Sequence, residues 1–522
     1  MIRRRQFLKQ VGAGSLGLAT MIYLPGCKSG PGTDTKAAMY SPESQGVSSQ
    51  GLIDFFDAAQ KSGLEFHSIM INRNGKTIVE GWWEPFKKEY VHTLFSLSKS
   101  FTSTAIGMLH DEGKLDVMAP VISFFEDKLP TRVGENLAAM RVYDLLTMHT
   151  GHDQDTMGRI RTSGNDDWVK AFLQLDVPLA PGTHFLYNTG ATFMLSAIVS
   201  NITGKNTKEY LTPRLFEPLG IVGADWEEDP HGINVGGYGL RVRTEDILNF
   251  GQLYLQKGEW KGKQLLSEDW ISEATRKQVD SQDNDSDWGQ GYGYQFWMCR
   301  PGCYRGDGAY GQYCIVIPEK NAVIAVTSES RDMGASMQLL WDHILPAMKE
   351  GSEPFKEDKS ATDTLMQRVT QLSLPIGKGL PADVLHHDVP ATSFVFEENP
   401  FQAKSVSFNF AGDVCEAVFH ENNTSITVKS GLSRWVTGDH RKEANSLFAI
   451  RGRTPMPTKI SSYFYWSDVS TLVMHLKYVE NTHADIFTFV FNEGGLALSF
   501  DNSLSHFNDN PDGRPAIKAS IV

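Results

Sequence analysis

The sequence predicts an α+β domain followed by an all-β C-terminal domain. Strand-like segments at 66–83 and 310–328 enclose a long middle portion in which apolar residues recur at helical spacing. This order favours a single sheet that the late strands complete and that helices cover. From about residue 405 the apolar residues recur at every second position, which is typical of half-buried strands.

The composition describes a globular chain with a large core. Of its 522 residues, 41% are apolar and 21% are charged, which excludes a disordered or collagen-like protein. The formal net charge of -13 provides no electrostatic footprint for nucleic acid, so we expect no nucleic-acid partner. Beyond the first 26 residues, no apolar stretch approaches the roughly 18 residues that a membrane span requires.

Residues 1–27 are predicted to be a targeting segment. Residues 4–9 (RRQFLK) resemble the twin-arginine export signature, and the weakly apolar run 11–23 has the length of a signal-peptide core. Residues 24–27 (LPGC) resemble a bacterial lipobox, in which Cys27 becomes the lipidated first residue of the mature chain. We therefore expect an exported, periplasmic protein, lipid-anchored to a bacterial envelope membrane; ordinary cleavage near Gly26 is the alternative.

The first domain is predicted to cover residues 40–350. Within 66–83, apolar runs flank the turn residues Arg73-Asn74-Gly75, which predicts a hairpin. Apolar spacing then predicts three helices, over 97–109, 191–199 and 337–348.

A change of composition marks the second domain. The polar stretch 351–363 is predicted to be a linker. Residues 364–522 follow with strand-like alternation, as in Val406, Phe408 and Phe410, and predict a sandwich or a small barrel.

The cysteines leave one question open. Cys299 and Cys303 flank a turn sequence, and a disulfide between them would need Cα atoms within roughly 7 Å. The alternative is two free thiols beside a hairpin turn. Because the chain has no Cys-x-x-Cys or His-Glu-x-x-His spacing, we expect neither a metal nor a cofactor.

One pair of residues carries nucleophile chemistry. Ser96-x-x-Lys99 is the only Ser-x-x-Lys in the chain, and it opens a predicted helix. Residues three apart lie on one helix face, so the amine can reach the hydroxyl. A chain of this length should contain about two such matches by chance, so the surrounding sequence has to decide.

That surrounding sequence resembles the penicillin-recognising serine hydrolases: class C β-lactamases, DD-peptidases and their esterase and amide-hydrolase relatives. Residues 94–109 resemble the family's nucleophile helix. Segments 144–151, 181–190 and 236–246 resemble further family landmarks, in the right order. The resemblance implies the β-lactamase/transpeptidase-like fold, an antiparallel sheet flanked by helices, over roughly 40–350.

The resemblance also implies roles for individual residues. Ser96 would be the nucleophile and Lys99 with Tyr187 its general base. The oxyanion hole would be formed by the backbone N–H groups of Ser96 and Ala309. The residues expected to bind substrate are Asn188, Thr189, Asp307 and Gly308.

Two motifs depart from the family pattern. Thr189 stands where β-lactamases have Asn, with Asn188 one place early. In the third motif, Gly306-Asp307-Gly308, the family's cation is missing. Arg305 lies one position out, and we expect it to need a bulge to turn inward and neutralise Asp307. Otherwise Asp307 places a negative charge where β-lactams dock a carboxylate, which disfavours such substrates.

Other conspicuous side chains are expected to be structural. Trp288 and Trp297 could line a cleft but are predicted to be core residues, and His149 and His152 have no part in Ser–Lys chemistry.

The predicted function is hydrolysis of an ester or amide in a small molecule or peptide, through an acyl-enzyme on Ser96. A DD-peptidase or weak β-lactamase is one alternative. A catalytically inactive envelope-binding protein that kept the fold is another.

Overall fold

A computed structural model describes residues 40–351, 353–380, 392–421, 424–439, 441, 447–448, 456–506 and 511–522. The predicted targeting segment 1–27, with Cys27, lies outside these residues. Among the described helices, none is long and apolar enough to cross a membrane.

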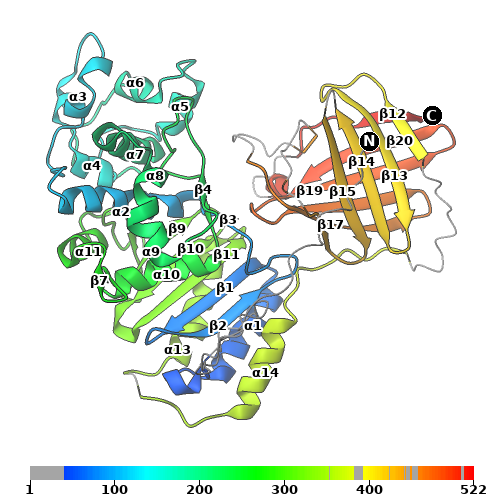
Figure 1. The fold of residues 1–522 in the computed structure, drawn as a ribbon, viewed down its shortest axis with the longest axis horizontal. Helices are drawn as coiled ribbons and strands as arrows, with labels where there is room; N and C mark the ends of the chain where they lie inside the picture. The colour runs from blue at the N-terminus through cyan, green and yellow to red at the C-terminus, as the bar shows by residue number, and fades with distance from the viewer. Residues whose placement is uncertain are drawn as a thin grey trace, which may run out of the picture. The chain divides into compact units, whose positions relative to one another are not determined.

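The first domain is built on a six-stranded antiparallel sheet in the order β2-β1-β11-β10-β9-β8 (Figure 1). The predicted hairpin is confirmed, because β1 and β2 pair across Asn74 and Gly75, which both have positive φ, as a tight hairpin turn requires. The late strands return to pair with β1, so the sheet joins both ends of the domain. Its strands are β1 (Glu65–Arg73), β2 (Lys76–Trp82), β8 (Trp297–Met298), β9 (Tyr304–Gly308), β10 (Gln312–Ile317) and β11 (Ala322–Glu329).

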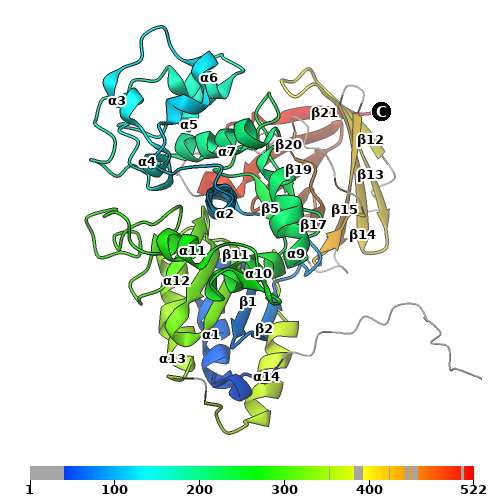
Figure 2. The ribbon, with the colours of Figure 1, turned by 60° about the vertical axis from the view of Figure 1, so that its left-hand side comes forward.

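Both faces of this sheet are buried. Along β1, Ile69 and Ile71 pack with α1 (Ser49–Ser62) and α14 (Lys359–Thr370), while Met70 packs on the opposite side with the helical core. The contacts of α10 (Thr244–Leu255) with β1, β10 and β11 cover that opposite face, as can be followed in Figure 2. Because alternate residues serve two cores, the central strands β10 and β11 are apolar along most of their length.

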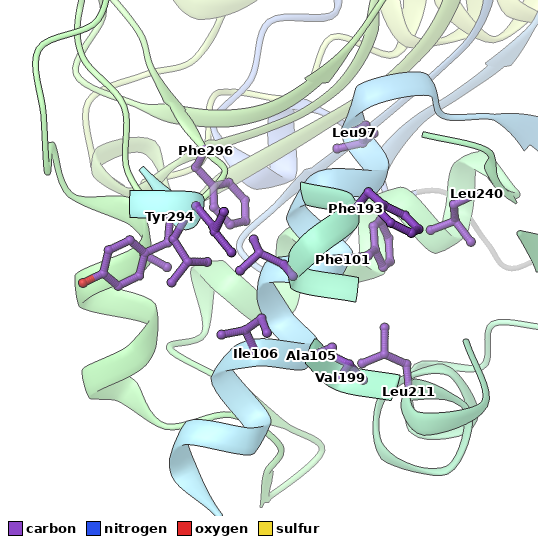
Figure 3. Close-up of a cluster of buried hydrophobic side chains, with 14 of the residues drawn as sticks. Leu97, Phe101, Ala105, Ile106, Phe193, Val199, Leu211, Leu240, Tyr294 and Phe296 are labelled. Atoms are coloured by element: carbon purple, nitrogen blue, oxygen red, sulfur yellow. The ribbon is translucent and has the colours of Figure 1, made fainter. Parts of the chain in front are cut away.

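The helical core holds together α2 (Ser98–Asp111) and α7 (Thr189–Thr203), the two helices at whose starts the candidate site lies. Phe101 and Ala105 of α2 pack among apolar side chains that include Phe193 and Val199 of α7, as Figure 3 shows. The remaining helices of this region are α3 (Glu135–Ala139), α4 (Val142–Leu146), α5 (Met157–Thr162), α6 (Trp168–Leu173), α8 (Thr207–Leu211), α9 (Glu217–Leu219) and α11 (Glu268–Thr275).

The predicted helix over 337–348 is interrupted. The structure has α12 (Met333–Leu339), then a π-helical turn at Leu340–Ile344, then α13 (Leu345–Ala347). Pro346 cannot donate a hydrogen bond to the preceding turn, and a wider turn accommodates the missing N–H.

The C-terminal domain is a closed β-barrel, one of the two architectures predicted. Strands run in the order β15-β14-β13-β12-β21-β20-β19-β18-β17-β16, and β15 also pairs with β17 in parallel, which closes the sheet. Alternate residues, such as Val406 and Phe408, fill its core. The strands are β12 (Thr392–Phe396), β13 (Ala403–Ala411), β14 (Val414–Glu421), β15 (Thr424–Leu432), β16 (Val436–Thr437), β17 (Ile460–Asp468), β18 (Thr471–Tyr478), β19 (Ala484–Asn492), β20 (Gly495–Asn502) and β21 (Ile517–Ile521).

The region between the two domains contains α14, which the sequence analysis did not predict. Its first residues fall within 351–363, the predicted linker, and its remainder within the predicted all-β range. Leu365 and Val369, four residues apart, are buried against the first domain's core. The helix therefore packs with the first domain, and the first described barrel strand is β12.

Candidate active site

Ser96 and Lys99 come together at the start of α2, as the sequence predicts. Ser96 lies in a 3₁₀ turn, Phe95–Leu97, that leads into the helix, and its side chain is partly exposed. The Nζ of Lys99, which is 1% exposed, lies 3.0 Å from the Oγ of Ser96. A buried amine thus contacts the hydroxyl of a half-buried serine.

Two further oxygens surround the Lys99 amine. It donates a hydrogen bond to the carbonyl of Gly237 at 2.8 Å and contacts the Oγ1 of Thr189 at 3.4 Å. The close approach needs glycine, because a Cβ on Gly237 would lie 2.7 Å from the Cγ2 of Thr189. The glycine-rich segment noted in the sequence therefore holds the lysine.

Tyr187 lies beside the Lys99 amine. Its ring stacks on Trp297 with centroids 5.3 Å apart, and the Nζ of Lys99 is 4.9 Å from its ring centroid. The side chain of Ser96 interacts with the Tyr187 phenol and lowers its pKa. Burial, and then the nearby Asp307 carboxylate, raise the pKa of the Tyr187 phenol above its ordinary value, which favours the protonated hydroxyl.

Asn188, predicted to bind substrate, has a different role in the structure. It is fully buried and caps α7: its Oδ1 accepts from the N–H of Gly190 and from both the N–H and the hydroxyl of Thr156. Its Nδ2 donates to Thr150. Asn188 therefore ties the loop at 150–156 to α7, while Thr189, beside Lys99, is the residue of this pair that faces the site.

Asp307 is paired with Arg305. The Nε of Arg305 lies 2.9 Å from the Oδ2 of Asp307, and the Nε1 of Trp288 donates to the same oxygen at 3.1 Å. Strand β9 pairs with β10 in regular register, so β9 does not have the expected bulge. None is needed, because Arg305 and Asp307 are two residues apart and therefore lie on the same face of the strand. Burial raises the pKa of Asp307, and Arg305 opposes that shift. The negative charge expected at Asp307 is matched by Arg305.

The predicted oxyanion turn follows directly. Gly308 and Gly311 are joined by a backbone hydrogen bond of 3.1 Å across Ala309 and Tyr310. A Cβ on Gly308 would lie 2.1 Å from the carbonyl oxygen of Leu94, so this turn packs against the segment that carries Ser96. Gly308 thus serves close packing, and Ala309 is left partly exposed beside it.

The remaining sequence predictions fall away from the reacting groups. His149 and His152 bond to Thr147 and Thr150, within their own loop, and burial lowers the pKa of His152 to about 4. Cys299 and Cys303 are free, buried thiols.

Sequence reasoning missed two contributors to the site. Trp297, predicted as core, is buried, but it also supports the ring of Tyr187, and no local pattern signals a contact between residues so far apart in the chain. Gly237 was noted as part of a glycine-rich loop, and the structure adds that its carbonyl binds Lys99.

A serine hydroxyl held by a buried lysine amine and a tyrosine phenol, at the start of a helix beside an antiparallel sheet, defines a serine hydrolase. Comparison with known families agrees. The Beta-lactamase family model matches residues 55–349, which is more than half of the chain. The chain belongs to the β-lactamase family.

Individual relatives are more distant. The chain is 24% identical over 289 residues to a 6-aminohexanoate-dimer hydrolase from Paenarthrobacter ureafaciens, covering 51% of this chain and 73% of that protein. It is 22% identical over 182 residues to a D-aminopeptidase from Brucella anthropi, covering 30% of this chain and 32% of that protein. Among solved structures, an octameric penicillin-binding protein homologue from Pyrococcus abyssi is 15% identical over 90% of this chain and 99% of that chain, with a TM-score of 0.48.

Proposed function

We propose that the protein cleaves the amide or ester bond of a small substrate through an acyl-enzyme on Ser96. The observation that carries this proposal is the 3.0 Å contact between the Lys99 amine and the Ser96 hydroxyl, with the Tyr187 ring beside the same amine. The names of the two curated relatives, both hydrolases, support the reaction class.

The first step forms a bond between the Oγ of Ser96 and the substrate carbonyl carbon. The serine proton passes to a neutral Lys99, and the resulting ammonium has hydrogen-bond acceptors at Thr189 and Gly237 as well as at Ser96. Tyr187 couples to this transfer through its own contact with Ser96. A lysine and a tyrosine that share one proton avoid placing the whole pKa shift on one group.

The second step expels the leaving group. The carbonyl oxygen becomes an oxyanion, which the N–H groups of Ser96 and Ala309 would stabilise, each by about 3 kcal/mol. The C–N or C–O bond then breaks, and Tyr187, protonated because its pKa is raised, supplies the proton to the departing atom while Lys99 restores it. Attack by water on the Ser96 ester releases the acid and regenerates the enzyme.

Specificity follows from the pairing of Arg305 with Asp307. The family's cation at the third motif is replaced by Gly306, where a Cβ would lie 2.4 Å from the Cδ1 of Leu97. The nearest cation on this strand, Arg305, is fully buried and bound to Asp307. No free cation of this motif is left to dock a carboxylate, so we expect neutral or cationic substrates to be preferred over anionic β-lactams.

A substrate panel tests the proposal. The purified mature chain would be assayed with p-nitrophenyl esters, matched neutral and anionic amides, a cephalosporin and D-Ala-D-Ala peptides. We expect the neutral ester or amide to give the higher kcat/KM. Preference for the cephalosporin or the D-Ala-D-Ala peptide would favour the β-lactamase or DD-peptidase alternative, and no turnover together with no Ser96 acylation would favour the inactive binding protein.

We also propose export and lipidation at Cys27, on the strength of the twin-arginine and lipobox patterns alone. Labelling of cells with a radioactive fatty acid tests this. Label on the wild-type chain that is lost in Cys27→Ala is expected, and an unlabelled wild-type chain would contradict it.

A further inference from the structure

Both predicted oxyanion donors adjoin an aromatic residue with an unusual backbone. Phe95, immediately before Ser96, has φ 47°, and Tyr310, immediately after Ala309, has φ 66°. Large side chains seldom adopt positive φ, and where they do the surrounding contacts must hold them there. The backbone of Phe95 leads directly into the N–H of Ser96, and Tyr310 is the third residue of the Gly308–Gly311 turn that carries Ala309.

The two aromatic rings hold each other. Their centroids lie 5.1 Å apart at an interplanar angle of 66°, an edge-to-face contact, and Phe95 is 2% exposed. The contact joins the segment that carries Ser96 to the turn that carries Ala309. A shift of either ring would alter the distance between the two N–H groups.

Hydrogen bonds fix the turn from behind. The carbonyl of Tyr310 accepts from the Oγ of Ser328 at 2.6 Å and from the N–H of Ser330 at 2.9 Å. The fully buried Gln312 donates from its Nε2 to the carbonyl of Ala309 at 2.9 Å. The peptide groups on both sides of Tyr310 are therefore anchored to the end of β11.

A third ring comes from the barrel. His483, in the turn between β18 and β19, lies 4.8 Å from the Tyr310 ring and 6.0 Å from the Phe95 ring. Its Nδ1 is 2.9 Å from the Oε1 of Glu329, the last residue of β11. His483 is thus held by the same strand end that anchors the Tyr310 turn.

A buried ion pair secures this arrangement. Glu65, His67 and Glu329 lie close enough together to hold a metal ion, but the ammonium of Lys477 on β18 contacts both carboxylates, at 2.5 Å for Glu329. The lysine supplies the positive charge that this group requires. The group therefore serves as the anchor of the β18–β19 turn.

We propose that Phe95, Tyr310 and His483 form an aromatic clamp that sets the spacing of the oxyanion-hole N–H groups, with His483 as a positioning residue supplied by the barrel. The proposal rests on the proposed function. It gives the barrel a role in the hydrolase reaction: without His483, the Tyr310 ring loses one of the contacts that support it beside Phe95.

The test compares full-length variants on a neutral p-nitrophenyl ester and with a trifluoromethyl ketone, whose tetrahedral adduct places an oxyanion in the hole. For His483→Ala we expect kcat to fall about tenfold and the ketone's affinity to fall by a similar factor, because a misplaced donor costs less than the 10²–10³ of a removed one. KM should change less than twofold. His483→Phe, which restores a ring, should recover most of both losses.

The matched control is His475→Ala, which removes a half-buried histidine ring that lies on β18 and stacks on Tyr463 of the barrel domain. If His483→Ala leaves both quantities unchanged, or lowers kcat without weakening the ketone, the clamp is overturned. If His483→Ala fails to fold, kcat and the affinity for the ketone are measured in His483→Phe and Tyr310→Leu instead. The clamp then predicts that both quantities fall in Tyr310→Leu and stay near the wild-type values in His483→Phe. Failure of the proposed function is distinguishable, because the wild-type chain would then fail to acylate Ser96.

Discussion

In the proposed mechanism, Tyr187 takes part in both the proton transfer and the departure of the leaving group. Its phenol contacts Ser96, its ring lies over Lys99 and stacks on Trp297, and its raised pKa keeps the proton on oxygen. A phenylalanine would keep the ring contacts and remove only the hydroxyl.

We expect Tyr187→Phe to lower kcat by about 10²–10⁴-fold, since it removes a positioned general acid. The measurement is steady-state kinetics on an amide, with thermal unfolding to show that the fold is retained. Tyr254→Phe is the matched control, because that hydroxyl bonds to Thr104 inside the helical core. Equal kinetic losses in both variants would remove Tyr187 from the reaction.

At this scale, one motif and its context predicted that Ser96 and Lys99 lie together, but not which residues support them. Ser96 and Lys99 are three residues apart, so helix geometry alone brings them together. Trp297 reaches Tyr187 from a distant strand, and Asn188 turned out to be a helix cap because its side chain meets Thr156, a contact that no local pattern shows.

The element of most consequence is strand β9, where Arg305 and Asp307 share one face. Their separation by two residues was visible in the sequence, and the alternation of strand faces was sufficient to predict that they pair. A bulge would be needed only for Arg305 to take the place of the family's cation at position 306, because neighbouring residues point to opposite faces of a strand. Pairing with Asp307 needs no bulge.

Breaking this pair from one side should destabilise the fold. Arg305→Met would leave the Asp307 carboxylate buried without its cation, and we expect the free energy of unfolding to fall by about 3–5 kcal/mol. Urea unfolding measures it. The double variant Arg305→Met/Asp307→Leu should recover most of the loss, since neither charge then remains.

An exposed pair provides the comparison. Lys114 contacts Glu112 at 2.7 Å with 52% of its side chain exposed, so Lys114→Met should cost no more than about 1 kcal/mol. If Arg305→Met costs no more than Lys114→Met, the Arg305–Asp307 pair is not the buried, mutually dependent unit described above.

For the whole molecule, the sequence predicted two domains and the barrel option through the change of period. The contacts between β18 and the first domain, such as Lys477 with Glu329, join residues 148 apart in the chain, and no local pattern encodes them. Helix α14 was missed because only Leu365 and Val369 mark its buried face within a polar stretch.

These contacts make stability depend on acid. Although burial alone would raise them, the pKa values of Glu65 and Glu329 are held below the ordinary 4.5, chiefly by Lys477. A carboxyl whose pKa is lowered by folding stabilises the fold above its unfolded pKa, and this contribution is lost as pH falls below it. We expect Tm to fall steeply below about pH 4.5 in the wild type.

Glu329→Gln should have a lower Tm at pH 7 and a shallower decline between pH 5 and about pH 3, because one of the shifted carboxyls is gone. Differential scanning calorimetry across this range measures both. Glu398→Gln, at an exposed position of the barrel domain, is the control and should follow the wild type. A Glu329→Gln chain with the wild-type acid slope would contradict the coupling.

The central claim is that Ser96 is the nucleophile, and covalent labelling tests it most directly. The full chain would be treated with a fluorophosphonate probe and the modified peptide mapped by mass spectrometry, with Ser96→Ala and Ser100→Ala in parallel. Ser100 lies one turn further along α2, buried and bonded to the carbonyl of Gln295, so it should not react. The account predicts one label on Ser96 in the wild type and in Ser100→Ala, and none in Ser96→Ala; a label that persists in Ser96→Ala would contradict it.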